Sequence, residues 1–426
     1  MLADRGNSRQ TAGPGPVRFA IVGDVAAVVL TLKAIAVDAG HELVAVVPIS
    51  REAGGVPELP LNVRRCRSWE ELLADPATQG AIVADDADES LVAARQFAAA
   101  GKALLLAPLV ARAAPFVYEL GLLRAERPVP LVPLYALRNH PLLRKLKHLL
   151  QSGGLGAIQH MQLEVRLVPR PPAGGQSSLS MDDLASAFLE DLDLLRLLGG
   201  EFDQVTAIRS GDPATGISLQ SITLSGAGLP QAIWSATPGI EPAWKLQVVG
   251  DQGTARLEGE TRLGRLSLEI PEPGGAPLVE RADFDSAAWC GVIARASETP
   301  AATPSRALGE GRAPLATWDD FTRAAELFEA VERSLRRRRT IEIHFESHSE
   351  RGQFKTHMTA VGCSLLTLTF FAVVAYLTAA SLIELPAVLK KVLVALIFLP
   401  LGLFLVLQGL IFLARPSNDS TPAGPE

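Results

Sequence analysis

Two acidic side chains, Glu190 and Asp193, stand three residues apart in a stretch whose leucine spacing predicts a helix over 181–198. Side chains at positions i and i+3 lie on the same helix face, so both carboxylates point the same way. Such a pair could transfer a proton or hold a cation. The alternative is an acidic helix face with no chemical role, in which the packing is done by Leu192, Leu194, Leu195 and Leu198.

A second candidate site lies at Gly23, between the apolar run 17–22 and an Ala- and Val-rich stretch of helical length, 25–39. With the next apolar run at 42–47, this order predicts a parallel βαβ unit. The first turn of such a unit binds dinucleotide phosphates when it carries the spacing G-x-G-x-x-G. Here only Gly23 is present, and Asp24 and Val25 follow it.

Further polar residues occur near predicted strand ends. The acidic run at 85–89 either contacts a ligand or forms a solvated helix start, which the helix dipole favours. Lys102 is a candidate base that the pattern puts at a strand entry. Arg138, His140 and His160 are as compatible with a structural role as with a functional one.

The composition limits the classes of protein. A chain of 426 residues has room for two folded domains and an appendix, and its net charge of -6 gives no reason to expect a nucleic-acid partner. Three distant cysteines and no CxxC spacing predict neither a disulfide framework nor a metal site. Residues 1–16 are polar and Gly/Pro-rich, which predicts a disordered N-terminus without an apolar signal segment and a cytoplasmic location for the folded part.

The elements that must position these residues fall into two blocks. Strands and helices alternate through 17–135, which predicts an α/β Rossmann-like domain with a doubly wound parallel sheet of five or six strands. Residues 136–345 carry runs of strands with period-two alternation, a helix over 319–336 and a strand over 340–345. This second block predicts an α+β domain with a large, mostly antiparallel open sheet.

Two long apolar runs, 358–382 and 392–414, follow a polar linker at 346–357. Each is long enough to cross a hydrocarbon layer of roughly 30 Å, so two C-terminal transmembrane helices are predicted. Lys and Arg residues flank the pair on its outer ends, which indicates a multi-pass anchor with the folded domains in the cytoplasm and the lipid bilayer as partner. Residues 415–426 are expected to be a disordered tail. The alternative is a buried helical hairpin.

Several stretches, in order, resemble the Gfo/Idh/MocA family of oxidoreductases, typified by glucose–fructose oxidoreductase and inositol dehydrogenase. VRFAIVG with HELVAVV resembles the first βαβ unit of that family, and AAAGKALLLAPL resembles its AGKHVLxEKPL segment. FLEDLDLLRLLGG resembles its GxHxxDLLxxLxG helix, and LQVVGDQGTARLE its G-x-x-G hairpin. The resemblance covers about 17–345 and implies a Rossmann domain, an α+β domain, NAD(P) as cofactor and a sugar or polyol substrate.

The chain departs from that family at the positions that carry its chemistry. Val25 puts a branched side chain where the phosphates would lie, and Pro48 replaces the acid that would bind the ribose. Ala107 stands where the family has its proton-transfer lysine, and Glu190 where it has a histidine, while its aspartate is kept as Asp193.

These departures lead to two hypotheses. The first is a membrane-anchored, catalytically impaired oxidoreductase-like protein, a pseudoenzyme that binds, scaffolds or senses and that forms a homo-oligomer through the sheet of its second domain. The alternative is an active NAD(P)-dependent oxidoreductase acting on a sugar or polyol with a rearranged site that uses Glu190 and Asp193. Neither hypothesis identifies the small-molecule ligand.

Overall fold

The computed structural model describes residues 17–23, 41–48, 63–126, 129–169, 178–212, 216–271, 275–284, 316–343, 364–379, 386, 391–400 and 402. The predicted helix over 25–39, together with Asp24 and Val25, lies outside these residues, as do the two predicted disordered ends. The chain divides into two compact units, Met1–His344 and Phe345–Glu426.

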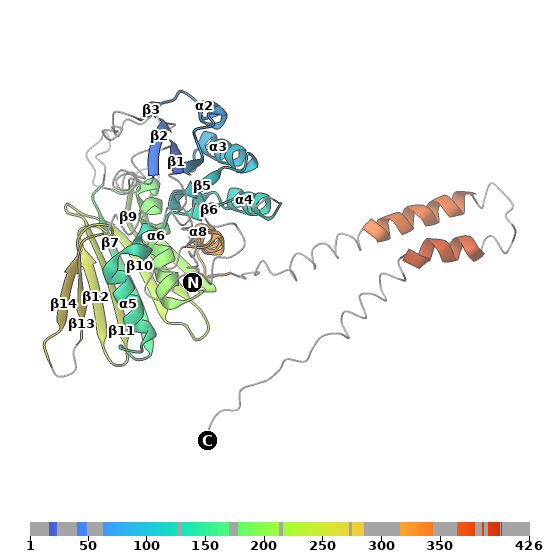
Figure 1. Ribbon diagram of the computed structural model, residues 1–426. Helices are drawn as coiled ribbons and strands as arrows, with labels where there is room; N and C mark the ends of the chain where they lie inside the picture. The colour runs from blue at the N-terminus through green and yellow to red at the C-terminus, as the bar shows by residue number, and fades with distance from the viewer. Residues whose placement is uncertain are drawn as a thin grey trace, which may run out of the picture. The chain divides into compact units, whose positions relative to one another are not determined.

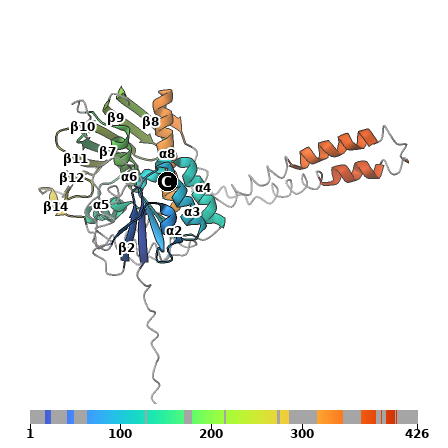
Figure 2. The same cartoon turned by 90° about the horizontal axis from the view of Figure 1, so that it is seen from above.

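The first half of the larger unit contains a six-stranded parallel sheet in the order β3-β2-β1-β4-β5-β6. Helices α2 (Trp69–Ala74), α3 (Asp88–Ala99) and α4 (Ala114–Glu126) lie on one side of this sheet (Figures 1 and 2). This strand order confirms the predicted Rossmann-like parallel sheet. The strands are β1 (Val17–Val22), β2 (His41–Val47), β3 (Arg64–Arg65), β4 (Gly80–Val83), β5 (Ala103–Leu106) and β6 (Leu131–Pro133).

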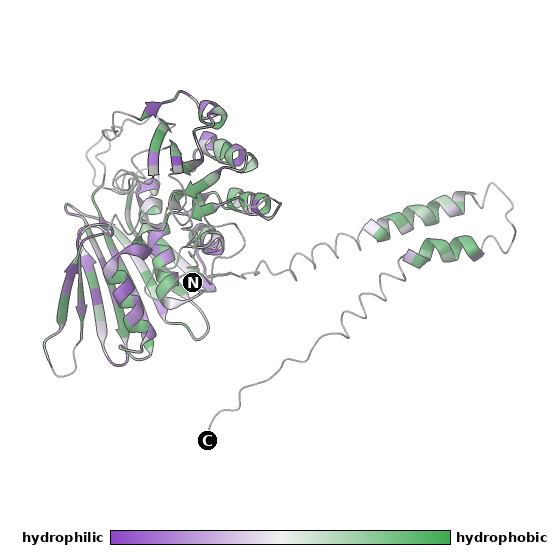
Figure 3. Ribbon diagram, viewed as in Figure 1, coloured by the Kyte–Doolittle hydropathy of each residue, from purple (hydrophilic) through white to green (hydrophobic). Residues whose placement is uncertain are grey.

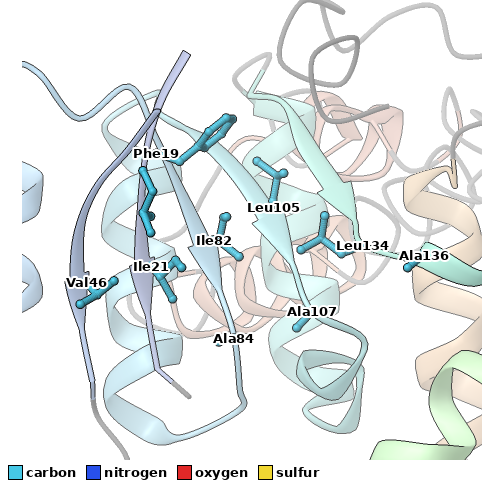
Figure 4. Packing of buried hydrophobic residues seen from close by; sticks show 10 residues of the cluster. Phe19, Ile21, Val46, Ile82, Ala84, Leu105, Ala107, Leu134 and Ala136 are labelled. Atoms are coloured by element: carbon cyan, nitrogen blue, oxygen red, sulfur yellow. The ribbon is translucent and has the colours of Figure 1, made fainter. Parts of the chain in front are cut away.

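One face of this sheet carries a buried apolar cluster, which Figure 4 shows from close by. Along β1 the cluster follows the period of two, because alternate side chains of a strand point to the same face. In β2 its members Leu43 and Val46 are three positions apart, because the register of β1 and β2 shifts between Phe19 and Ala20. The cluster continues past the strand ends, with Ala84 after β4, Ala107 after β5 and Leu134 after β6. Its members are Phe19, Ile21, Leu43, Val46, Ile82, Ala84, Leu105, Ala107, Leu134 and Ala136.

The second sheet has nine described strands in the order β14-β13-β12-β11-β7-β10-β9-β8-β15. The pairing of β10 with β7 is parallel and the other pairings are antiparallel, as predicted for a mostly antiparallel sheet. Hydrophobic and hydrophilic residues alternate along these strands (Figure 3). The strands are β7 (Ile158–Leu167), β8 (Gln204–Asp212), β9 (Gly216–Ser225), β10 (Gln231–Pro238), β11 (Ala243–Gly250), β12 (Thr254–Gly259), β13 (Leu266–Ile270), β14 (Leu278–Ala282) and β15 (Ile341–Glu342).

Three helices pack on the nine-stranded sheet: α5 (Pro141–Gln151), α6 (Met181–Gly199) and α8 (Trp318–Arg337). Capping boxes start α6 and α8, with Ser180 and Asp183 in the first and Thr317 and Asp320 in the second. Each box satisfies backbone N–H groups that a helix start leaves without partners. Two short 3-10 helices, η2 (Pro108–Arg112) and η3 (Ala136–Asn139), follow β5 and β6 and contact α6.

The prediction of a multi-pass membrane anchor is wrong. Within the part of Phe345–Glu426 that the structure describes, the helical stretches are 364–379 and 391–400. Among all described residues, no helix combines the length and the apolar character required to cross a bilayer.

Candidate functional site

The predicted acid–base candidates lie on α6, between the two sheets, and both are buried. Asp193 accepts two hydrogen bonds from the Arg138 guanidinium, at 2.7 Å from Nε and 2.6 Å from Nη2. Arg138 comes from η3 and also donates to Asp320 of α8 at 3.1 Å. Although burial opposes it, the neighbouring Arg138 charge lowers the pKa of Asp320. Asp193 is therefore part of an ion network that joins three elements.

Glu190 has different partners from Asp193. One carboxylate oxygen accepts the Leu137 backbone N–H at 2.9 Å, and the other lies 3.2 Å from Nε of Arg262. Burial raises the pKa of Glu190, and the Arg262 charge opposes this shift. Both oxygens are thus engaged by groups of the protein. Sequence reasoning placed the two carboxylates on one helix, but it gave no sign that each would bind a separate arginine.

Asp191, between them, was not singled out by the sequence and is fully buried. Its two oxygens accept indole N–H groups, from Trp234 at 2.9 Å and from Trp244 at 3.0 Å. Burial raises its pKa, while Arg262 and the two indoles act in the other direction. The signal available in the sequence was a tryptophan in each of two strands, β10 and β11, but nothing in their spacing predicts a shared carboxylate.

The other polar candidates are also bound within the fold. Lys102 donates from Nζ to the carbonyl oxygens of Leu73 at 2.9 Å and Asp75 at 3.2 Å, so it caps the end of α2. His140 is the N-cap of α5, and its Nδ1 accepts the Leu142 N–H at 3.3 Å. Burial lowers the pKa of His140 and so favours the neutral form of its ring.

His160 lies in β7, opposite Gln231 of β10 and Val249 of β11. It is part of the pairing of three strands in the second sheet. The structure does not bring His160 to Glu190 or Asp193 through any hydrogen bond among the described residues, and its role as a site residue stays a prediction.

At the carboxyl edge of the parallel sheet, Gly23 follows β1 with φ of +105°, and Asp85 follows β4. A β-carbon built on Gly23 would lie 2.8 Å from a carboxylate oxygen of Asp85, so this carboxylate lies against the first turn. Asp85 Oδ1 accepts from the Ala87 N–H at 3.1 Å and the Ser90 hydroxyl at 2.6 Å. The run at 85–89 is therefore not simply a solvated helix start.

Two further residues complete this edge. Asp86 pairs with Arg112 at 3.2 Å, and Arg112 also reaches Asp182 of α6 at 2.7 Å. Ala107, at the position expected for a catalytic lysine, is buried and donates its N–H to Val83 at 2.9 Å. Pro48, after β2, is exposed. Among the described residues, no group of His, Cys, Asp and Glu side chains is arranged to hold a metal ion.

Solved structures share this arrangement of two sheets. A putative myo-inositol dehydrogenase from Sinorhizobium meliloti is 21% identical in sequence, with a TM-score of 0.58 over 77% of this chain and 100% of that one. GenD2 from gentamicin A biosynthesis, solved in complex with NAD, is 20% identical with a TM-score of 0.59 over 81% of this chain and 100% of that one. The chain has the fold of these oxidoreductases.

A third structure with this fold is an aldose-aldose oxidoreductase from Caulobacter crescentus complexed with glycerol, 18% identical with a TM-score of 0.59 over 77% of this chain and 100% of that one. The predicted likeness to sugar and polyol oxidoreductases is confirmed at the level of the fold. No protein-family model matches the sequence, and no curated protein matches it.

The oxidoreductase fold implies a dinucleotide, but the described residues do not fit its pyrophosphate. The Asp85 carboxylate lies against Gly23, the glycine of the tight turn that comes just before the phosphate position of this fold. A phosphate placed about 4 Å from that carboxylate would be repelled by about 4 kcal/mol at an effective dielectric near 20. Pro48 has no side-chain acceptor for a ribose hydroxyl. The predicted obstruction by Val25 lies outside the described residues.

Proposed function

We propose that this chain is a divergent, non-catalytic member of the Gfo/Idh/MocA oxidoreductases that uses the family's fold to bind a small molecule. The observation that carries this proposal is the state of Asp193, which is 1% exposed and held by two hydrogen bonds from Arg138. A proton-transfer group must reach the proton that it moves, directly or through one water. Because Asp193 is buried and both of its oxygens bind Arg138, a substrate cannot reach it, and its role is to stabilise the fold.

The contacts of Glu190 support the same proposal. Its two oxygens bind Leu137 and Arg262, and Ala107 supplies no ionisable group at the edge of the parallel sheet. Loss of one positioned acid–base group slows a reaction by about 10²–10⁴. Here the two groups that the family resemblance implies are both replaced, and the replacement at Glu190 is bound within the protein.

Titration of the purified protein with NADH and NADPH tests the proposal. Tryptophan emission reports on the site, since Trp234 and Trp244 both bind Asp191 beside Glu190. We expect no saturable change at micromolar dinucleotide. Saturable micromolar binding together with turnover of any sugar or polyol would overturn the proposal.

The alternative, an active NAD(P)-dependent oxidoreductase, is favoured by the fold it shares with GenD2 in complex with NAD. The raised pKa of Glu190 also suits a group that donates a proton. This alternative expects Glu190→Gln to lower turnover by about 10² or more. Turnover that is unchanged by Glu190→Gln contradicts this role for Glu190.

The predicted homo-oligomer through the nine-stranded sheet also stays a proposal. Exposed side chains such as Ile208 of β8 lie on that sheet, and light scattering of the purified chain tests it. An oligomer that becomes monomeric on Ile208→Lys supports the prediction, and a monomer in the unaltered protein contradicts it.

A further inference from the structure

His140, the N-cap of α5, is fully buried, and one of its ring nitrogens has no hydrogen-bond partner among the described residues. Its Nδ1 accepts the Leu142 N–H at 3.3 Å, so the proton of the neutral ring is on Nε2. The Gly264 backbone acts on the charge of the ring, yet no described residue is placed to accept a hydrogen bond from Nε2. Folded proteins leave few buried donors without an acceptor, so each such donor requires a specific explanation.

A second donor without an acceptor lies one helical turn further along α5. The Arg144 N–H bonds the His140 carbonyl oxygen at 3.1 Å, which puts the two residues one turn apart. Nε of Arg144 is buried, and within the described part of the chain nothing accepts a hydrogen bond from it or pairs with its charge. Burial lowers the pKa of His140 and the Arg144 charge acts in the same direction, so the two side chains are near each other.

These two donors lie close to the carboxyl edge of the parallel sheet. The centroid of the His140 ring is 6.5 Å from that of the Phe284 ring. Phe284 packs against the apolar cluster, which continues past the ends of β4, β5 and β6 (Figure 4). In open α/β sheets, ligands bind outside the carboxyl ends of the strands. Both donors are therefore near the region where a small molecule bound to this fold would lie.

The charges around His140 and Arg144 favour an anion. Asp283 is the carboxylate that acts on His140, but it is largely exposed and lies 3.8 Å from Nε of Arg265. Arg144 thus keeps a partly buried positive charge at the end of α5 where the helix dipole is also positive. One carboxylate or phosphate group has several acceptor oxygens, so it can bond to Nε2 of His140 and Nε of Arg144 together.

We propose that His140 and Arg144 form a binding site for an oxyanion, the carboxylate or phosphate group of the small molecule that this chain binds. The inference rests on the proposed binding role and names the chemical class of the group that is recognised. Nε2 of His140 orients the group as a neutral donor, and the Arg144 guanidinium supplies the charge. The site uses none of the residues of the first turn at Gly23, where Asp85 disfavours a phosphate.

Isothermal titration calorimetry with inorganic phosphate and with acetate tests this site, with chloride at equal ionic strength as the reference. We expect roughly millimolar binding of at least one of the two anions to the unaltered protein. Arg144→Gln removes the charge and should weaken that binding about tenfold or more, because charge-assisted hydrogen bonds are the strong ones. His140→Asn keeps a capping acceptor for the Leu142 N–H but is too short to put a donor at Nε2, so it should also weaken binding.

Two comparisons make the result specific. Lys145→Gln removes the same charge from the next position of α5, which is exposed, and should leave the affinity unchanged. Without an added anion, Arg144→Gln should melt within about 2 °C of the unaltered protein, because no ion pair is lost. An arginine with only a structural role would lower the melting temperature by more than this, which would contradict the proposal.

The site is overturned if neither anion binds the unaltered protein, or if Arg144→Gln weakens binding no more than Lys145→Gln. The anion that binds more tightly identifies the recognised group as a phosphate or a carboxylate. The experiment uses no dinucleotide, so its failure is separate from a failure of the proposed non-catalytic function. Turnover of a sugar or polyol with NADH would overturn that function and leave the calorimetric result standing.

Discussion

The Asp193 carboxylate is bound by both Nε and Nη2 of Arg138, a residue 55 positions earlier in the chain. This contact joins α6 to η3, and the further bond from Arg138 to Asp320 joins η3 to α8. Since η3 directly follows the parallel sheet, the network connects the two sheets through buried charge.

Replacing Arg138 should destabilise the protein strongly. Arg138→Ala leaves a buried carboxylate without its partner, and we expect a loss of about 3–5 kcal/mol in the free energy of unfolding. Urea denaturation measures it. Arg95→Ala, which breaks an exposed pair with Glu119, is the control and should cost about 1 kcal/mol or less. A similar small loss for both variants contradicts a structural role for the Arg138–Asp193 contact.

The free energy of unfolding should depend on pH partly through the ionisation of Glu190. Because its native-state pKa is raised above the ordinary value of 4.5, the folded protein holds this proton at pH values where the unfolded chain has released it. This contribution is fully present below pH 4.5 and is lost as the pH rises through the raised pKa. Glu190→Gln removes that loss, so its stability relative to the unaltered protein should increase with pH.

Denaturation of both proteins at several pH values from 4 to 8 measures this trend. The exposed Glu258→Gln on β12 serves as the control and should show no comparable trend. If Glu190→Gln instead becomes less stable relative to the unaltered protein as the pH rises, the fold stabilises the ionised form of Glu190, which contradicts the prediction.

Substitution of Gly23 should separate backbone strain from the effect of Asp85. Gly23→Ala meets the Asp85 carboxylate at 2.8 Å and needs a φ of +105°, whereas Gly101→Ala needs a φ of +76° with open space around it. The left-handed conformation alone costs about 1–2 kcal/mol. Gly23→Ala should therefore be the more destabilising in urea denaturation.

The Asp85→Ala variant serves as the background in which the carboxylate is absent. In that background, Gly23→Ala meets no carboxylate. Its loss in the free energy of unfolding should therefore come closer to the loss caused by Gly101→Ala in the unaltered protein. An extra cost that persists without the carboxylate would show that Asp85 is not what fills the space beside the first turn.

Lys102 should contribute to stability rather than to chemistry. Lys102→Met removes the hydrogen bonds to the carbonyls of Leu73 and Asp75 that cap α2, and we expect a loss of about 1–2 kcal/mol. Thermal and urea denaturation measure it. Lys145→Ala, which breaks the exposed pair with Glu280, should cost less. Equal losses would argue against the capping role.

The sequence by itself determined the order of elements in the larger unit. Period-two apolar runs and helical stretches of ordinary length predicted β7 over 158–167 and α6 over 181–198, within one residue of the structure. These signals are local, because the side chains of one element decide which of its faces is apolar. The short edge strands β3 and β14 were missed, since two arginines and the half-polar run LVERA carry little local pattern.

Other features were decided only by the tertiary structure. Apolar length predicted two membrane spans, but none of the helices that the structure describes has the length and apolar character that crossing a bilayer requires. The partners of Glu190 and Asp193 also follow from the fold, because Arg262 and Arg138 reach α6 from elements far away in the chain. Pairings at such separations depend on how the sheets pack, and no local spacing of residues encodes them.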